Sequence, residues 1–126
     1  MEKDYNKIQS FKDLIAWQEG HKLVLIVYDI TKLFPKDEQF GLSSQLRRAV
    51  VSITSNIAEG FSRKSLKEKI QFYSMSHGSL TEVENQLIIA KDVRYISQET
   101  FNNTSDVMVV VSKTLNGLIK SLRSLS

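Results

Sequence analysis

The sequence predicts an all-α fold, an up-down-up-down bundle of four helices, and three observations lead to it. Apolar residues recur every three or four positions in four long stretches, the spacing of a helix face that packs on a core. Only one Pro and five Gly occur among 126 residues, too few for a fold with many turns. The connections between the stretches are short and polar, so consecutive helices are expected to be antiparallel neighbours. We expect a single domain over residues 1–126, because a chain of this length can bury a core of its own.

The first helix is expected over residues 11–34, after a polar leader over residues 1–9 that has no apolar signal-peptide segment. Ser10 and Asp13 form a capping-box pattern at its start, because each side chain can bind amide groups that the helix leaves unpaired. Pro35 ends the helix, since a proline ring clashes with the preceding turn.

The other three helices are expected over residues 42–62, 66–95 and 98–124. Ser65 opens the second of these with another capping-box pattern. Gly78 lies inside that helix, where glycine is unfavourable, and we interpret it as a point of close approach to another helix. The last helix has a regular heptad of apolar residues, with additional valines that widen its apolar face.

Composition and charge exclude several classes of protein. The chain has no Cys, so it has neither disulfides nor thiolate metal sites, and it suits a reducing compartment. No apolar run approaches the roughly 20 residues that span a bilayer, so we expect a cytoplasmic protein with no membrane contact. The net charge of +3 permits an anionic partner without requiring one.

Catalytic and metal-binding patterns are not found, so we expect no enzyme, no catalytic residue, no metal and no cofactor. A di-iron bundle needs Glu-x-x-His motifs, and neither His21 nor His77 has an acid three residues before it. Nucleophile elbows, phosphate loops and dinucleotide fingerprints do not occur. Both histidines fall on core stripes, as do Trp17, Tyr28 and Tyr73, and we interpret all five as packing residues of the core.

The second helix carries a polar stripe whose composition favours contact with something other than water. It combines arginines and small hydroxyls with one Asn and one Glu: Arg47, Arg48, Ser52, Ser55, Asn56, Glu59 and Arg63. If the second and third helices fold back near Arg63 and Lys64, Arg47 and Arg48 lie level with residues 79–84.

An arginine at that level can pair with Glu82 or Glu84, because its planar fork holds a carboxylate with two hydrogen bonds. Glu84 falls close to the apolar stripe, where a carboxylate without a partner is costly. We therefore expect a polar network, buried in one chain or at a subunit interface, formed by Arg48, Asn56, Glu59, Ser79, Glu82 and Glu84. The alternative is that one arginine remains free for phosphate.

The expected turn between the second and third helices is rich in cations: Arg63, Lys64, Lys67 and Lys69. Such a cluster can hold a nucleic-acid backbone through phosphate contacts, and the alternative is a solvated helix start. Lysines near a helix N-terminus oppose the helix dipole, which favours a partner. The candidate nucleic-acid-binding residues are Arg47, Arg48, Arg63, Lys64 and Lys67.

A second apolar surface is indicated outside the main core stripes. Its members are Val51, Phe72, Met75, Ile88, Ile89 and Val110. Because bundles usually bury such residues on another subunit, we expect a homo-oligomer.

Four segments give the chain a family resemblance: LIAWQ from Leu14, the Phe34-Pro35 stop with Glu38 and Gly41-Leu42, QLRRAVVSITSNIAEGFSR, and GSLTEVENQL from Gly78. On these segments the sequence resembles the proteins of the 23S ribosomal RNA intervening-sequence family, and the resemblance extends over nearly the whole chain, from Phe11 to Leu122. The resemblance implies a helical bundle that assembles as a homopentamer. A related group, the accessory variability proteins of diversity-generating retroelements, forms a basic pentameric barrel that works with a reverse transcriptase and nucleic acid. His77 departs from the family pattern, which commonly has a small apolar residue before the glycine.

Two hypotheses follow. The first is a non-enzymatic, oligomeric bundle that binds structured RNA by backbone contacts. The second is a structural or protein-interaction scaffold that binds no nucleic acid, in which the charged stripe only holds subunits together. A third possibility is a small anionic ligand between subunits near the Arg and Asn stripe.

Overall fold

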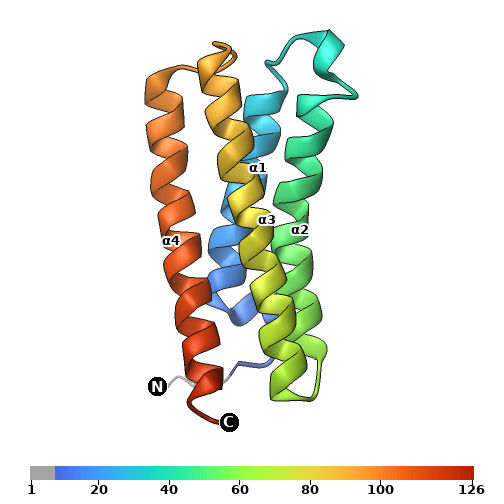
Figure 1. Ribbon diagram of the computed structural model, residues 1–126, viewed down its shortest axis with the longest axis vertical. Helices are drawn as coiled ribbons and strands as arrows, with labels where there is room; N and C mark the ends of the chain where they lie inside the picture. The colour runs from blue at the N-terminus through green and yellow to red at the C-terminus, as the bar shows by residue number, and fades with distance from the viewer. Residues whose placement is uncertain (1–7) are drawn as a thin grey trace, which may run out of the picture.

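The computed structural model describes residues 8–126, and these residues form four helices and no strand (Figure 1). The helices are α1 (Ile15–Thr31), α2 (Leu42–Ser62), α3 (Leu66–Asp92) and α4 (Gln98–Arg123). Short 3₁₀ turns at Phe11–Asp13 and Lys36–Glu38 precede α1 and α2. The prediction of an all-α fold with four helices is confirmed. Most of the predicted leader over residues 1–9 lies outside the described residues.

The four helices lie side by side along the long axis of the molecule (Figure 1). The α1–α2 and α3–α4 connections lie at one end, and the α2–α3 connection lies at the other. Hydrogen bonds join α2 to α3 from Gln45–Gln86 to Ser52–Ser79, and the backbone of Gly60 lies against Tyr73 near the turn. The helix α2, which carries the polar stripe, is therefore packed against α3 along most of its length.

The first helix is shorter at both ends than its predicted range of residues 11–34. The capping box of Ser10 and Asp13 is present, with the Ser10 amide donating to Asp13 Oδ2 over 3.0 Å, but it caps a 3₁₀ turn. Leu14 is extended, with ψ of 131°, so α1 begins one residue later. At the other end Phe34 N–H donates to the Thr31 carbonyl oxygen over 3.2 Å, a turn that ends the helix before Pro35.

The bounds of α2 are those predicted, whereas α3 ends three residues before the predicted residue 95. Arg94 stops it, because its φ of 69° lies in the left-handed region. Tyr95 N–H then donates to the Ala90 carbonyl oxygen over 2.8 Å. Ser65 caps α3 as predicted by accepting from Glu68 N–H over 3.0 Å, but the return bond of a capping box is not formed there. Ser97 caps α4 by accepting from Thr100 N–H over 3.0 Å.

The core contains the predicted stripes of α2, α3 and α4, and its largest fully buried side chain is Tyr73. The predicted stripe of α1 is wrong in part, because the buried face of that helix is formed by residues such as Leu23 and Ile30. Two of the predicted packing residues were placed wrongly. His21 is exposed and stacks on Trp17 with ring centroids 4.8 Å apart. Tyr28 is also exposed, because α1 turns that side of its stripe toward Arg47. His77 is half-buried, and its Nε2 lies 3.2 Å from Ser112 Oγ.

The prediction that Gly78 permits a close helix approach is wrong, because a Cβ added there would have no neighbour within 4 Å. The close approach is at Gly60, where an added Cβ would lie 2.8 Å from Cε1 of Tyr73. Gly60 therefore lets the end of α2 lie directly on the Tyr73 ring, which brings the α2–α3 turn and its cations against α3.

Candidate nucleic-acid interface

The predicted nucleic-acid-binding cations do not form one site, because α2 separates them. Arg47 lies in the second turn of α2, and Arg63 directly follows the last residue of that helix, 16 positions further along, which corresponds to about 24 Å along the helix axis. Arg63, Lys64 and Lys67 gather at the α2–α3 turn, and Arg47 lies toward the other end of the bundle. Arg48 lies next to Arg47 and is exposed.

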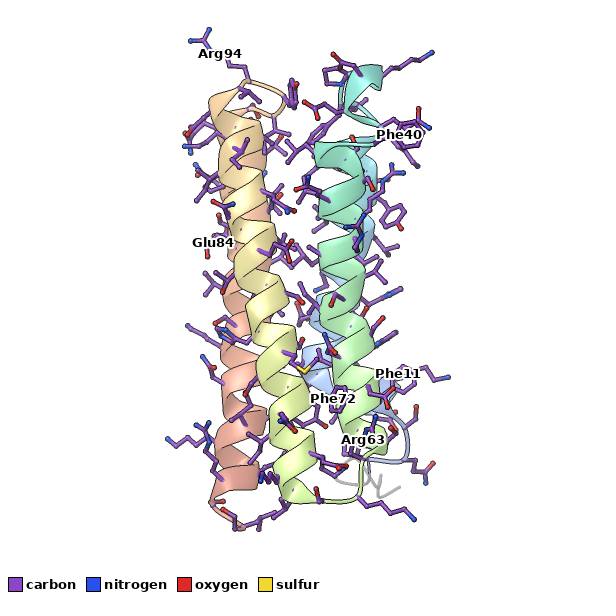
Figure 2. All side chains as sticks on the ribbon, turned by 45° about the vertical axis from the view of Figure 1, so that its right-hand side comes forward. Phe11, Phe40, Arg63, Phe72, Glu84 and Arg94 are labelled. Carbon is purple, nitrogen blue, oxygen red and sulfur yellow. The ribbon has the colours of Figure 1, made fainter. Side chains whose placement is uncertain are left out.

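Arg63 is anchored at the turn by neighbours on both helices. A guanidinium nitrogen donates to Glu59 Oε2 over 2.8 Å, and both side chains are partly exposed. The guanidinium carbon lies 4.7 Å from the centroid of the Phe72 ring, beside which Figure 2 shows it. An arginine over an aromatic face and beside a carboxylate is fixed in place and largely neutralised.

Lys64 and Lys67 have no such partners. Both are exposed, and no carboxylate of the described residues lies within ion-pair distance of either ammonium group. Lys64 lies in the connection and Lys67 in the first turn of α3, so their charges stand at the N-terminal end of a helix. Two unneutralised cations at this position are open to an anionic partner.

Lys69, the fourth cation of the predicted cluster, has a structural role. Its ammonium group donates to the carbonyl oxygens of Phe61 over 2.7 Å and Gly60 over 3.4 Å. These carbonyls lie at the end of α2, where helix carbonyl groups lack intrahelical partners. A lysine bound at a helix C-terminus also favours the helix dipole, so Lys69 caps α2.

Arg47 faces α1 and not α3, which corrects its predicted pairing with Glu82 or Glu84 within one chain. Its Nε donates to Thr31 Oγ1 over 2.8 Å, and its guanidinium carbon lies 4.6 Å from the centroid of the Tyr28 ring. No carboxylate of residues 8–126 is within ion-pair distance of it. The charge of Arg47 is therefore held in position without being neutralised.

The predicted polar network exists in part, as a seam between α2 and α3. Ser79 Oγ donates to Ser52 Oγ over 3.0 Å, and Asn56 Nδ2 donates to the same oxygen over 3.1 Å. Further along, Gln86 Nε2 lies 3.4 Å from Gln45 Oε1 and 3.3 Å from Glu82 Oε2. Ser52 was in the predicted stripe, but Gln45 and Gln86 were not singled out. The signal that identifies these two glutamines is their equal distance along the chain from the α2–α3 turn.

Arg48 and Glu84 do not belong to this seam. The pairs Ser52–Ser79 and Gln45–Gln86 set Arg48 level with Val83, and Glu84 points away from the bundle in Figure 2. Both charged side chains are exposed, so the prediction that Glu84 needs a partner inside the chain is wrong. Pairing of Arg48 with a Glu across a subunit boundary stays a prediction.

Glu38 joins the two connections at the opposite end of the bundle, a role that sequence reasoning missed. Its Oε1 accepts from Leu42 N–H over 2.9 Å, and its Oε2 accepts from the Tyr95 hydroxyl over 2.8 Å. These two hydrogen bonds hold the pKa of Glu38 below its usual value, and the bond to Glu38 raises the pKa of Tyr95. A Cβ at Gly41 would lie 2.7 Å from Glu38 Oε1, which explains the Glu38-x-x-Gly41-Leu42 pattern.

Residues 8–126 have neither a metal-ligating cluster nor a membrane-spanning helix. These residues contain no group of three or more His, Cys, Asp or Glu side chains arranged to hold a metal ion. Over the same part of the chain, each helix is too short or too polar to cross a membrane.

Comparison with known proteins connects this arrangement to a family. The profile of the 23S rRNA-intervening sequence proteins matches residues 12–117. Among curated proteins nothing matches the chain. A crystal structure of a protein with unknown function from the S23 ribosomal protein family of Bacteroides thetaiotaomicron has the same fold, with a TM-score of 0.77. It is 21% identical, and the alignment covers 84% of this chain and 99% of that chain.

Proposed function

The chain belongs to the 23S rRNA-intervening sequence protein family, and with that membership as premise we propose that it binds structured RNA through backbone phosphates. It acts in this proposal as a non-enzymatic, cytoplasmic bundle. The observation that carries the proposal is the pair of exposed, unneutralised lysines at the α2–α3 turn, Lys64 and Lys67.

The surroundings of the two lysines favour a rigid contact with a polyanion. Lys69 caps α2 and Arg63 is fixed over Phe72, so the connection between the helices is held from both sides. Lys64 and Lys67 then project from a fixed turn, and little backbone entropy is lost when phosphates bind. Phosphate contacts of this kind carry no sequence information, so the specificity of the proposed binding rests on the shape of the RNA.

The proposal is tested by titrating a fluorescein-labelled RNA hairpin with the protein and measuring fluorescence anisotropy at low and moderate salt. We expect micromolar or tighter binding that weakens as salt rises, because bound phosphates release counterions. Lys64→Glu with Lys67→Glu reverses the two charges and is expected to weaken binding at least tenfold.

The matched control is Lys113→Glu with Lys120→Glu, which makes the same change in net charge on the exposed surface of α4. We expect it to weaken binding much less than the reversal at the turn. Equal losses in the two double variants would mean that net charge alone attracts the RNA. Absence of binding at low salt would contradict the proposal and favour the scaffold hypothesis.

A second candidate function, an assembly scaffold, is favoured by the apolar side chains on the outside of the bundle. On α3 they are Met75, Ile88 and Ile89, and on α4 they are Val109 and Val110, all exposed in the single chain. We propose that the up-down-up-down bundle assembles through these faces into the homopentamer that the family resemblance implies. Ile89→Lys is expected to dissociate the assembly in sedimentation velocity, whereas Leu125→Lys, at the exposed C-terminal end, is expected to leave it intact.

Arg48 and Glu84 are exposed and therefore suited to an ion pair across the subunit boundary in this assembly. Arg48→Glu is expected to weaken assembly, and adding Glu84→Arg is expected to restore it, because the swapped charges attract again. If the double variant is as defective as the single one, the pairing is wrong. Assembly without any RNA binding would support the scaffold function alone.

A further inference from the structure

A hollow of about 540 Å³ lies between the end of α1 and the start of α2, away from the α2–α3 turn. Its polar and aromatic lining includes Lys32, Lys36, Phe40, Ser43, Ser44 and Arg47. None of its lining residues is Asp or Glu, although the α1–α2 connection contains Asp37 and Glu38. Small-molecule sites have volumes of roughly 300–1,000 Å³, so the hollow is large enough for a ligand with one ring system and a charged group.

Arg47 is the fixed point of the hollow. Tyr28 supports its guanidinium from one side, and Thr31 Oγ1 accepts its Nε–H, while Thr31 itself donates to the Val27 carbonyl oxygen over 2.8 Å. Arg47 Nη2 also lies 3.5 Å from the Tyr28 carbonyl oxygen, so these contacts occupy the ring-facing side and the edge of the planar group that faces α1. Its remaining N–H donors have no carboxylate to bind among residues 8–126. An arginine held in this way presents a fork that fits two phosphate oxygens.

Two lysines add to this positive charge. Lys36 forms no ion pair with a described carboxylate, and the contact of Lys32 with Asp29 is long, at 3.7 Å between largely exposed groups. Such exposed pairs contribute little and separate readily. The hollow therefore combines one arginine held in position and two exposed lysines, with no opposing acid in its wall.

Ser43 adds a hydroxyl to the wall of the hollow. No other described residue exchanges a hydrogen bond with this hydroxyl, and solvent reaches its oxygen from the hollow. A phosphate oxygen bound in the hollow can therefore accept a hydrogen bond from Ser43 without displacing a partner within the chain.

Phe40 provides an aromatic surface on the same wall. It is 90% exposed, the largest value among the large apolar side chains, and Figure 2 shows it standing out from the start of α2. A phenylalanine ring exposed beside a cationic hollow is the arrangement on which nucleobases stack.

We propose that the hollow binds a nucleoside monophosphate unit, with its phosphate on Arg47, Lys32 and Lys36 and its base stacked on Phe40. The unit is either a free nucleotide or an unpaired nucleotide of an RNA strand, since both present the same phosphate and base. The site lies at the other end of α2 from Lys64 and Lys67, so it does not depend on the RNA binding proposed above.

The test is isothermal titration calorimetry of the full chain with AMP, and separately with adenosine and with inorganic phosphate. AMP is expected to bind at least tenfold more tightly than either fragment, because only AMP offers both the phosphate and the base. Lys32→Ala with Lys36→Ala is expected to weaken AMP binding at least tenfold, without affecting the core contacts of Arg47.

Two further variants give matched controls. Phe40→Ala is expected to weaken AMP binding about tenfold through lost stacking, whereas Leu33→Ala, at an equally exposed apolar residue outside the hollow, is expected to leave it unchanged. Lys64→Glu with Lys67→Glu is expected to weaken hairpin binding at least tenfold and leave AMP binding unchanged. Circular dichroism confirms that each variant is folded.

Comparing AMP with a short oligoadenylate distinguishes the two sources. Tighter binding of the oligonucleotide that is lost in Lys32→Ala with Lys36→Ala identifies unpaired RNA, and equal affinity identifies a free nucleotide. The proposal is overturned if millimolar AMP gives no binding, if adenosine binds as well as AMP, or if the lysine and Phe40 variants bind normally. Hairpin binding that persists beside a failure with AMP would leave the function of the turn intact.

Discussion

Arg47 lies near the start of α2 and Arg63 directly follows its last residue, and although each guanidinium has an aromatic neighbour, only one of the two has an acid beside it. Each guanidinium lies over an aromatic ring, at 4.6 Å from Tyr28 and 4.7 Å from Phe72. Arg63 also binds the carboxylate of Glu59, whereas the hydrogen bonds of Arg47 go to a hydroxyl and a carbonyl oxygen of α1. The charge of Arg63 is therefore neutralised, and the charge of Arg47 is not.

The two ends of α2 differ in the same sense. At its last turn the helix is packed tightly on α3 through Gly60, and its carbonyls are capped by Lys69. At its first turn it borders an open hollow, and Glu38 ties it to the α3–α4 connection. The comparison shows that the role of an arginine is decided by the groups around it. An acid beside the guanidinium neutralises its charge, whereas contacts to a neighbouring helix hold the charge in position without neutralising it.

The tight end is broken most strongly by Gly60→Ala. The added methyl would lie 2.8 Å from Tyr73 and 3.1 Å from Cβ of Phe72, so the ring or the helix must shift. Overpacking of this kind costs about 1–3 kcal/mol of unfolding free energy. Urea unfolding followed by circular dichroism measures the loss.

Gly78→Ala is the matched control, because a methyl at this exposed helical position meets nothing within 4 Å. It is expected to raise the unfolding free energy by roughly 0.5–1 kcal/mol, since alanine is the better helix former. If both variants are stabilised, the close packing at Gly60 is not rigid.

The two arginines are compared directly by Arg47→Gln and Arg63→Gln. Arg47→Gln removes the stacking on Tyr28 and the hydrogen bond to Thr31, and we expect a loss of about 1 kcal/mol that salt changes little. Arg63→Gln removes a partly exposed ion pair, with an expected loss of roughly 0.5 kcal/mol that shrinks at high salt. Urea unfolding at two salt concentrations distinguishes the two losses. If salt reduced the loss in Arg47→Gln and not the loss in Arg63→Gln, Arg47 and not Arg63 would be the neutralised arginine.

The smallest expected effect concerns Glu38, at the open end. Because its pKa is lower in the folded chain than the ordinary 4.5, its contribution to stability is complete above that value and is lost as the pH falls through the folded pKa. The melting temperature is expected to fall less steeply between pH 7 and pH 3 in Glu38→Gln than in the wild type. The glutamine keeps the shape of the side chain and one acceptor oxygen but does not titrate. Parallel pH profiles of the two proteins would show that Glu38 is not responsible.

Tyr95 responds at the other extreme of pH. Because the pKa of Tyr95 is raised in the folded chain, its hydroxyl is protonated below the ordinary pKa of 10 and donates a hydrogen bond to Glu38. The contribution of this hydrogen bond to stability is complete below that value and is lost as the pH rises through the folded pKa. Tyr95→Phe removes the effect and serves as its control.

The fold could be predicted from the sequence because helix periodicity is a local property of the chain. The bounds of α2 follow directly from its stripe and from the serine that caps α3. The ends of α1 and α3 could not be predicted, since the extended Leu14 and the left-handed Arg94 depend on how the chain turns back on itself.

The candidate site could be predicted only in part. The seam of Ser52, Asn56 and Ser79 follows from the polar stripe and its distance from the turn. The partners of Arg47 did not follow, because the rotation of α1 about its axis decides whether Tyr28 faces the core or α2. The role of Gly78 was predicted wrongly for a similar reason. A small residue between two serines can lie either at a close helix contact or on an exposed helix face, and the sequence does not distinguish the two.

The salt dependence of RNA binding in single charge-removal variants tests the central claim most directly, that Lys64 and Lys67 contact phosphates. The logarithm of the binding constant is plotted against the logarithm of salt concentration for the wild type, Lys64→Gln, Lys67→Gln and the control Lys113→Gln. We predict that each turn variant lowers the slope by about one unit and that the control leaves it unchanged. Equal slopes in all four proteins would contradict the claim.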